Sequence, residues 1–461
     1  MKPAARRALS ARGAERRDFF RTATAGAAGA VFANSLVTHD DLDALTQNVR
    51  TASKPSELKI TDLRVAVVTG APMVCPLIRI DTNQGLVGYG EVRDGANERY
   101  ALSLKSRVVG ENPCNVDRIF RKIKQFGGHA RQAGGVCGIE MALMDLAGKA
   151  WGVPCWQMLG GRFRDRVRLY ADTTETESPK EQGERLKARM ALGLTYLKQD
   201  FGINLLENVP GTLMMPVGYS YRQSQAVMHP FTGIEITDKG IAWLDEWVGT
   251  LRSTIGPEIP LASDHFGHIG VNSCIRLARA MEKHNLAWME DMVPWQLGHL
   301  LKQIKDNTTT PILTGEDIFL KEEFMKLIEM EAVDMIHPDL ASAGGLMETK
   351  KIGDYAMEHG VPMAMHFAGT PISFMANVHC AAATENFIAL EHHSIDVPWW
   401  ESMVTSPKPM IEKGFAIVPD LPGLGVELNE DVVKAHLAPN ATYFAPTPEW
   451  DTFRSNDRLW S

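Results

Sequence analysis

Three short apolar runs between residues 261 and 316 each end in an acidic residue: Leu261-Ala262-Ser263-Asp264, Ala287-Trp288-Met289-Glu290 and Ile312-Leu313-Thr314-Gly315-Glu316. Asp264 and Glu290 are 26 residues apart, and so are Glu290 and Glu316. One strand, one helix and two loops fill such an interval, so the stretch predicts three successive β/α units. Parallel barrel strands end on one rim, where these three carboxylates would lie side by side.

The same alternation of short apolar runs and amphipathic helical stretches continues on both sides. The predicted strands cover residues 166–170, 196–201, 260–264, 287–290, 312–316, 335–337, 363–366 and 388–390. Seven or eight such units in series predict an α/β fold, a modified TIM-type (β/α)8 barrel over residues 166–400. The connection at residues 204–239 is far longer than the others, and we expect either a lid over the catalytic face or an oligomer contact.

A smaller unit precedes the barrel. Residues 58–68, 75–81 and 85–91 read as strands, and residues 101–125 and 136–151 as helices. This order predicts an N-terminal α+β domain over residues 57–165, and residues 401–461 form a separate C-terminal segment.

The first 38 residues have the pattern of a targeting signal. The basic head contains Arg16-Arg17-Asp18-Phe19-Phe20, and residues 22–39 contain no Asp, Glu, Lys or Arg. This pattern resembles a twin-arginine signal peptide, and it predicts export of the folded protein to the periplasm. A disordered basic tail on a cytoplasmic protein is the alternative.

Composition excludes several classes of protein. The chain has 461 residues, a net charge of −8 and a pI near 6.0, which argues against a nucleic-acid partner. We find no apolar run of the roughly 18 residues that a membrane span needs. The six cysteines are scattered without a C-x-x-C pair, so neither a zinc knuckle nor a disulfide framework is expected.

Asp264, Glu290 and Glu316 together predict a metal site. Each of these acids alone would more often be a helix N-cap. Three carboxylates converging on one rim repel one another unless a cation joins them, and hard oxygen ligands with room for water suit Mg²⁺.

A carboxylate and an imidazole follow in the same register. Asp339 and His366 are 27 residues apart, again one barrel unit. An aspartate beside a histidine fixes its tautomer and raises its basicity, which is what a general base requires near neutral pH. We therefore expect His366 to act as the base and Asp339 to support it.

These features resemble the enolase superfamily, and within it the mandelate racemase and muconate-lactonizing group, over roughly residues 57–440. The resemblance rests also on the segment Glu140-Met141-Ala142-Leu143-Met144-Asp145-Leu146-Ala147-Gly148-Lys149 and on the run from Gly152-Val153-Pro154 to Leu159-Gly160-Gly161. It implies a capping domain completed by the C-terminal tail, and Mg²⁺-assisted removal of the proton alpha to a carboxylate. It also implies that Glu391 is protonated and hydrogen-bonds the enediolate.

The second strand departs from the family pattern. Members of the racemase type usually have Lys-x-Lys there, whereas this chain has Lys198-Gln199-Asp200. Lys198 would neutralise charge near the substrate carboxylate, and Asp200 replaces the lysine that usually acts as base. Lys198 remains an alternative base, but the substitution weakens a two-base racemase.

The preferred function is therefore a lyase reaction, the dehydration of a sugar acid. His366 itself could protonate the leaving hydroxide, and His268 is a second candidate for that acid. Glu91, Arg93 and Asp94, which follow the third N-terminal strand, are candidate contacts from the capping domain. The polar side chains favour a small polyhydroxy carboxylate as substrate, and the resemblance implies a homo-oligomer.

Three alternatives remain. An epimerase, racemase or cycloisomerase of the same superfamily would share the first half-reaction. A non-catalytic binding protein on this fold would be expected to lose part of the acid set. A metal-dependent hydrolase would want a His-x-His pair, which this chain lacks.

Overall fold

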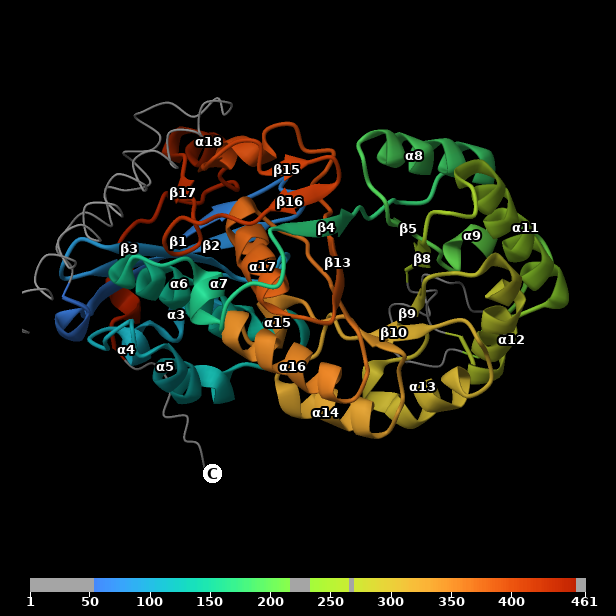
Figure 1. The fold of residues 1–461 in the computed structure, drawn as a ribbon, viewed down its shortest axis with the longest axis horizontal. Coiled ribbons are helices and arrows are strands. Elements are labelled where there is room, and N and C mark those ends of the chain that lie inside the picture. The colour runs from blue at the N-terminus through green and yellow to red at the C-terminus, as the bar shows by residue number, and fades with distance from the viewer. Residues whose placement is uncertain (1–53, 216–232, 265–268, 453–461) are drawn as a thin grey trace, which may run out of the picture.

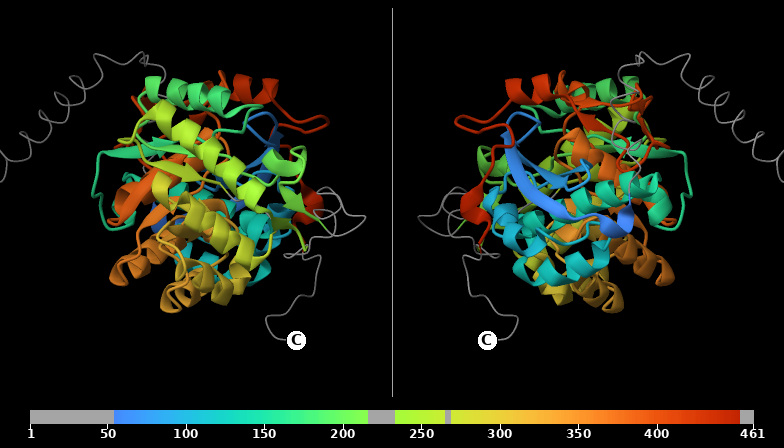
Figure 2. Two further views of the ribbon diagram at one scale, coloured as in Figure 1. Left: turned by 90° about the vertical axis from the view of Figure 1, so that its right-hand side faces the viewer. Right: turned by 90° about the vertical axis from the view of Figure 1, so that its left-hand side faces the viewer.

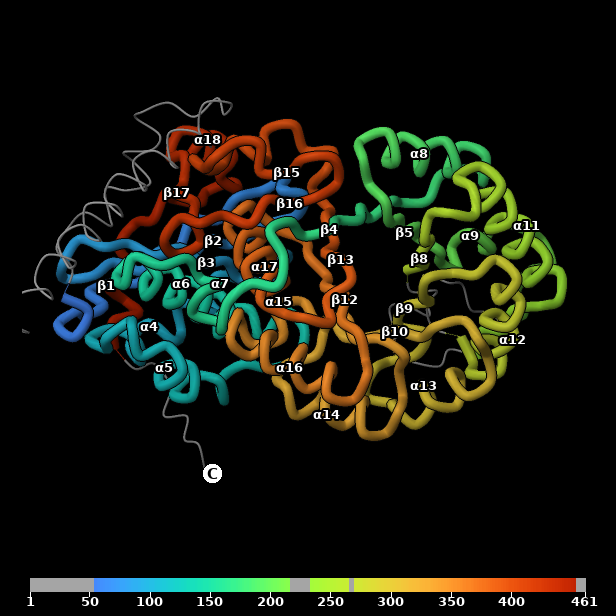
Figure 3. The backbone as a smooth tube through the Cα atoms, in the orientation of Figure 1, coloured from blue at the N-terminus to red at the C-terminus, as the bar shows by residue number. Residues whose placement is uncertain are grey.

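Eight parallel strands form a ring in the larger part of the molecule (Figures 1 and 3). The computed structural model describes residues 54–215, 233–264 and 269–452. The ring strands are β4 (Arg166–Tyr170), β5 (Leu197–Gln199), β8 (Leu261–Ser263), β9 (Met289–Glu290), β10 (Ile312–Thr314), β11 (Met335–Ile336), β12 (Met363–Met365) and β13 (Phe387–Glu391). Neighbours pair in parallel from β5 through β13 to β4. Beyond the ends of β5 and β4, the Asp200 amide donates to the Thr173 carbonyl at 3.0 Å. The predicted barrel is confirmed.

Helices cover the outside of the ring. In chain order they are α8 (Pro179–Ala191), α9 (Asn204–Glu207), α11 (Asp238–Ile255), α12 (Val271–Met281), α13 (Gly298–Lys305), α14 (Lys321–Glu329), α15 (Leu340–Ala343), α16 (Leu346–Glu358) and α17 (Pro371–Ala383). The long connection 204–239 contains α9 and a small antiparallel pair, β6 (Leu213–Met214) with β7 (Glu235–Ile236). Residues 216–232 of the predicted lid lie outside the described residues.

One buried layer inside the ring takes a residue from each strand or its start. Its members are Tyr170, Tyr196, Ala262, Trp288, Leu313, Met335, Ala364 and Ala389. Its aromatic rings, Tyr170, Tyr196 and Trp288, pack against one another with centroids 5.2 to 5.9 Å apart. Because side chains alternate along a strand, the residues two positions further also point inward, toward the C-terminal rim.

The N-terminal domain contains an antiparallel sheet of β1 (Ile60–Val68), β2 (Cys75–Thr82) and β3 (Val87–Glu91). Helix α6 (Gly134–Trp151) packs on this sheet so closely that a Cβ on Gly90 would lie 1.9 Å from the Gly138 carbonyl oxygen. The helix predicted for residues 101–125 is instead several short ones: α3 (Arg99–Leu102), α4 (Lys105–Val108) and α5 (Val116–Ile123). Gly110, with φ of +85°, and Pro113 separate α4 from α5.

Two glutamates of this domain hydrogen-bond the starts of barrel helices. The Glu140 carboxylate accepts from the Leu346 amide at 2.7 Å and the Met347 amide at 3.0 Å, at the first turn of α16. Glu91 accepts from the Thr370 amide at 3.1 Å, where α17 begins. A helix start presents free amides and a positive dipole end, so buried carboxylates are stabilised there. These contacts fix the cap against the rim of the barrel.

The C-terminal segment returns to the cap, as Figure 2 shows for the red and blue chain ends. It contains β14 (Val404–Thr405), β15 (Ile411–Glu412), β16 (Phe415–Ile417), β17 (Glu427–Leu428) and α18 (Glu430–Ala435). The Thr69 amide donates to the His436 carbonyl at 3.0 Å. Strand β16 also pairs antiparallel with β4.

Two predictions concern parts of the chain that are not fully described. The predicted signal segment 1–38 lies outside the described residues. Among those that are described, we find no helix with the length and apolar character that crossing a bilayer requires.

Candidate active site

Lys198 lies among three of the predicted acids at the C-terminal rim. Its Nζ is 2.9 Å from Glu391 Oε1 and 3.3 Å from both Asp264 Oδ2 and Glu290 Oε2. The lysine is 1% exposed, so its charge interacts with these carboxylates through little water. Strands β5, β8, β9 and β13 thus deliver four predicted site residues to one place.

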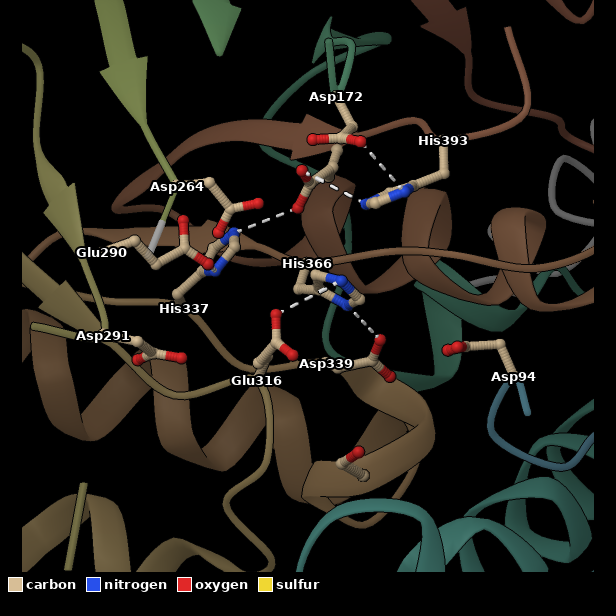
Figure 4. A network of polar contacts seen from close by, with 12 residues as sticks. Asp94, Asp172, Asp264, Glu290, Asp291, Glu316, His337, Asp339, His366 and His393 are labelled. Carbon is tan, nitrogen blue, oxygen red and sulfur yellow. Dashed lines mark hydrogen bonds and ion pairs between the residues drawn. The ribbon is translucent and has the colours of Figure 1, made fainter. Parts of the chain in front are cut away.

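The three predicted metal ligands fall into two neighbouring groups of carboxylates, each within 4.8 Å. Glu290 and Glu316 lie with Asp291, and Asp264 lies with Asp172 and Asp200. Figure 4 shows Asp264, Glu290 and Glu316 on the same side of His366. The Lys198 ammonium lies 3.3 Å from an oxygen of both Asp264 and Glu290 and offsets part of their charge. The donors are all hard oxygens, which fits a divalent cation such as Mg²⁺.

Asp291 is an acid of this rim that the sequence analysis missed. Its φ is +45°, a left-handed conformation that a non-glycine residue rarely adopts. The Thr314 hydroxyl donates a hydrogen bond to its Oδ1. Backbone strain of this kind often accompanies a functional site. Here it directs the Asp291 carboxylate toward those of Glu290 and Glu316.

Asp339 and His366 form the predicted dyad. His366 Nδ1 is 2.6 Å from Asp339 Oδ2, and its Nε2 is 3.4 Å from Glu316 Oε2. Both residues are buried. Burial alone would lower the pKa of His366, but the Glu316 carboxylate raises it to about 10. A cation bound at Glu316 would offset the carboxylate charge that raises the pKa of His366. The imidazole would then be neutral more readily, and the neutral form is the one that a base needs.

Arg93 reaches this dyad from the cap. Its Nη1 is 3.1 Å from Asp339 Oδ2 and donates to the Ser342 hydroxyl at 2.8 Å and the Glu316 carbonyl at 3.0 Å. The guanidinium is 1% exposed and also pairs with Asp94 at 2.7 Å. A buried arginine in such contacts fixes the orientation of the Asp339 carboxylate that contacts His366. Of the three cap candidates, Arg93 and Asp94 belong to the site, and Glu91 serves the start of α17.

A polar network beneath the rim links Glu290 to Glu391. Tyr170 Oη is 2.6 Å from His337 Nε2 and donates to Glu391 Oε2 at 3.1 Å. His337 Nδ1 lies 3.0 Å from Glu290 Oε1, and Trp288 Nε1 donates to Glu290 Oε2 at 3.1 Å. All five residues are buried, so these contacts hold both carboxylates in fixed directions.

Asp200 lies against Asp172, not against a cation. Burial and the charge of Asp172 raise the pKa of Asp200 to about 10, so it carries a proton near neutral pH. On the other side of Asp172, His393 Nδ1 is 3.5 Å from Asp172 Oδ2, and His393 Nε2 is 3.4 Å from Glu391 Oε1. The sequence analysis singled out neither Asp172 nor His393.

Glu391 differs from its expected protonated state. Burial alone would raise its pKa, but the Lys198 ammonium and His393 hold it well below the usual range. These neighbours favour the ionised form of Glu391, whereas the expected hydrogen bond to an enediolate requires a proton on it. His268, the other acid candidate, lies outside the described residues.

Two regularities of the sequence could have located the missed residues. His393 follows His366 by 27 residues, the interval that also separates Asp339 from His366. Asp172 and His337 each lie two positions beyond a residue of the buried inner layer, Tyr170 and Met335. Extending the barrel interval to the first and last strands would have found Asp172, 26 positions before Lys198, and His393.

Comparisons with known proteins agree with this geometry. Residues 46–160 match the mandelate racemase/muconate lactonizing enzyme N-terminal domain family, and residues 224–432 match the enolase C-terminal domain-like family. A D-xylonate dehydratase of Haloferax volcanii is 35% identical over 428 residues, 89% of this chain and 97% of the relative. A D-galactonate dehydratase family member of Pantoea ananatis is 27% identical over 422 residues, 87% of this chain and 98% of the relative.

Solved structures share the architecture. A mandelate racemase/muconate lactonizing enzyme-like protein from Rubrobacter xylanophilus aligns with a TM-score of 0.75 and 30% identity, covering 84% of this chain and 99% of that one. A mandelate racemase/muconate lactonizing enzyme from Jannaschia gives a TM-score of 0.70 and 28% identity, with 82% and 98% covered. Because its curated relatives are dehydratases, the chain is assigned to the hydro-lyases. It belongs to the enolase superfamily, in the mandelate racemase and muconate-lactonizing enzyme group.

Proposed function

We propose that the enzyme dehydrates a small sugar acid: it removes the proton alpha to the carboxylate, eliminates the β-hydroxyl as water and yields a 2-keto acid. The Asp339–His366 dyad carries this proposal, because it lies on the same rim as the carboxylates of Glu290 and Glu316. The relatives named D-xylonate dehydratase and D-galactonate dehydratase family member support a five- or six-carbon aldonic acid as substrate.

Each residue has a defined part in this reaction. Asp264, Glu290 and Glu316, with Asp291 near the last two, would hold Mg²⁺. When bound, the ion supplies positive charge that binds the substrate carboxylate and stabilises the negative charge that develops on it.

The protein side chains do the remaining work. Lys198 offsets negative charge beside the substrate carboxylate. His366 removes the alpha proton, and Asp339 and Arg93 hold its imidazole in place. Glu391, beside the Lys198 ammonium, would hydrogen-bond an oxygen of the enediolate once it carries a proton.

The test is incubation of the Mg²⁺-loaded enzyme with aldonic, uronic and aldaric acids in D₂O, following 2-keto acid formation and deuterium at the alpha carbon. Keto acid that His366→Asn fails to produce would support the proposal. His359→Asn, which changes an exposed histidine just after α16, is the matched control and should behave as the unmodified enzyme. Deuterium exchange without keto acid would instead favour epimerisation, racemisation or cycloisomerisation.

We also expect export through the twin-arginine route and assembly into a homo-oligomer. Replacing both Arg16 and Arg17 by lysine should retain the protein in the cytoplasm of its host, as cell fractionation would show. Equal distribution of the two forms would contradict the export expectation. Light scattering of the purified protein gives the oligomeric state.

A further inference from the structure

His393 is a second histidine at the rim, just beyond the last barrel strand. Its Nδ1 lies 3.5 Å from the Asp172 carboxylate and its Nε2 lies 3.4 Å from Glu391. His366 has the same surroundings: an aspartate at Nδ1 and a glutamate, Glu316, at Nε2. The rim therefore holds two imidazoles, each supported by an aspartate from another strand.

The two imidazoles are spaced to act on neighbouring carbons. Their ring centroids are 5.4 Å apart, and Figure 4 shows His393 on the opposite side of His366 from Asp339. A proton donor or acceptor needs to be within about 3 Å of the atom it serves. Two rings at this separation can each reach a substituent when those substituents are on adjacent carbons, which elimination requires.

His393 is the more accessible of the two imidazoles. Its side chain is 15% exposed, against 7% for His366. Burial would lower the pKa of His393, but Glu391 and Asp172 raise it above its usual value. The flanking carboxylates thus favour the imidazolium, which is the form that donates.

We propose that His393 is the catalytic acid that protonates the leaving β-hydroxyl, while His366 removes the alpha proton. The inference rests on the proposed dehydration and assigns a residue to its second half.

The proton balance of this step closes. His366 takes the alpha proton, and the C–H electron pair forms the enediolate. That pair then forms the double bond between the alpha and beta carbons as the bond from the beta carbon to oxygen breaks. The departing oxygen takes a proton from His393 and leaves as water. As the resulting enol becomes the keto acid, its beta carbon takes the proton from His366 and its hydroxyl proton returns to His393.

The experiment separates the two half-reactions in His393→Gln. Keto-acid formation should fall by about 10²- to 10³-fold, which is typical for loss of a general acid, while alpha-deuterium exchange stays within about tenfold of the unmodified enzyme. With a substrate analogue that has fluorine in place of the β-hydroxyl, the variant should turn over within about tenfold of the unmodified enzyme. Fluoride can leave without taking up a proton. His359→Asn should change none of these rates.

Other outcomes overturn the inference. Equal losses in exchange and in keto-acid formation, with no rescue by the fluoro analogue, would mean that His393 only maintains the site. Undiminished keto-acid formation would show that another group donates the proton. If the unmodified enzyme forms no keto acid from any tested acid, the proposed function itself fails and this inference with it, whereas a defect confined to the variant concerns His393 alone.

Discussion

Two buried lysines of this protein, Lys149 and Lys198, differ in the carboxylates and hydrogen-bond partners that surround them. Lys149 in α6 contacts Asp145 at 2.9 Å and Glu427 at 2.6 Å, and it donates to the Val87 carbonyl at 3.0 Å. Asp145 also accepts from two backbone amides, those of residues 89 and 424. Lys198 is shared by three carboxylates, with further acids beside them.

The difference distinguishes scaffold from active site. The carboxylates around Lys149 accept hydrogen bonds from this lysine and from backbone amides. These contacts satisfy the group without a ligand from outside the chain. The rim has more negative charge than Lys198 can neutralise, which is costly without another cation. A buried cluster of carboxylates thus indicates a ligand site when the positive side chains that contact it do not balance its negative charge.

The largest expected effect on stability comes from removing the scaffold lysine. Lys149→Met leaves Asp145 and Glu427 buried without their cation, so the free energy of unfolding should fall by about 3–5 kcal/mol. Turnover per folded molecule should be unchanged. Urea unfolding followed by circular dichroism, combined with an activity assay at low urea, would measure both. A loss of turnover with unchanged stability would mean that Lys149 serves the active site and not the scaffold.

Removing the rim lysine should affect mainly activity. Lys198→Met takes away the cation beside the reacting carboxylate, so kcat/KM should fall by about 10²- to 10³-fold, a usual loss for one electrostatic partner. With Mg²⁺ present, the free energy of unfolding should fall less than in Lys149→Met. If Lys198→Met were the less stable of the two, the rim would be part of the scaffold.

Acid should destabilise the scaffold through His379. This residue of α17 accepts from the Trp156 amide and contacts the Leu424 carbonyl, and burial lowers its pKa to about 4. Between pH 6.5 and 4 the unfolded chain binds the proton and the folded chain does not. Stability is therefore full above pH 6.5 and falls as the pH drops, by about 3 kcal/mol for this one group.

The His379→Gln variant provides the measurement. Its free energy of unfolding should depend less steeply on pH between 6.5 and 4 than that of the unmodified protein. His359→Asn, on the surface, should keep the original slope. Identical slopes for all three proteins would mean that His379 titrates normally in the fold.

The smallest expected effect is stabilisation by the cation itself. Mg²⁺ at about 100 times its dissociation constant should add roughly 2.7 kcal/mol to the free energy of unfolding. EDTA should remove this gain, and Glu290→Gln should reduce it. A thermal melt with and without Mg²⁺ measures the effect without any substrate. An unchanged melting temperature would contradict a cation site among these acids.

The sequence predicted the barrel and most of the rim because both follow from a repeat. Asp264, Glu290 and Glu316 follow one another at intervals of 26 residues, so these acids identified one another. The same interval led to Asp339 and His366.

The missed features depend on contacts that no interval encodes. The left-handed turn at Asp291 and the placement of Asp264 and Glu316 in different carboxylate groups arise from packing between strands. Arg93 reaches Asp339 from 246 positions earlier in the chain. Its place in the site could be suspected from the sequence, but its partners could not be named.

The two glutamates that meet the starts of α16 and α17 bear on how the protein folds and evolves. The starts of both helices bond to side chains supplied by the other domain, so part of their hydrogen bonding forms only when the cap has docked. The barrel and the cap should consequently unfold in a single transition. A chimera that joins this barrel to the cap of a distant relative would need matching acids at positions 91 and 140 to remain cooperative.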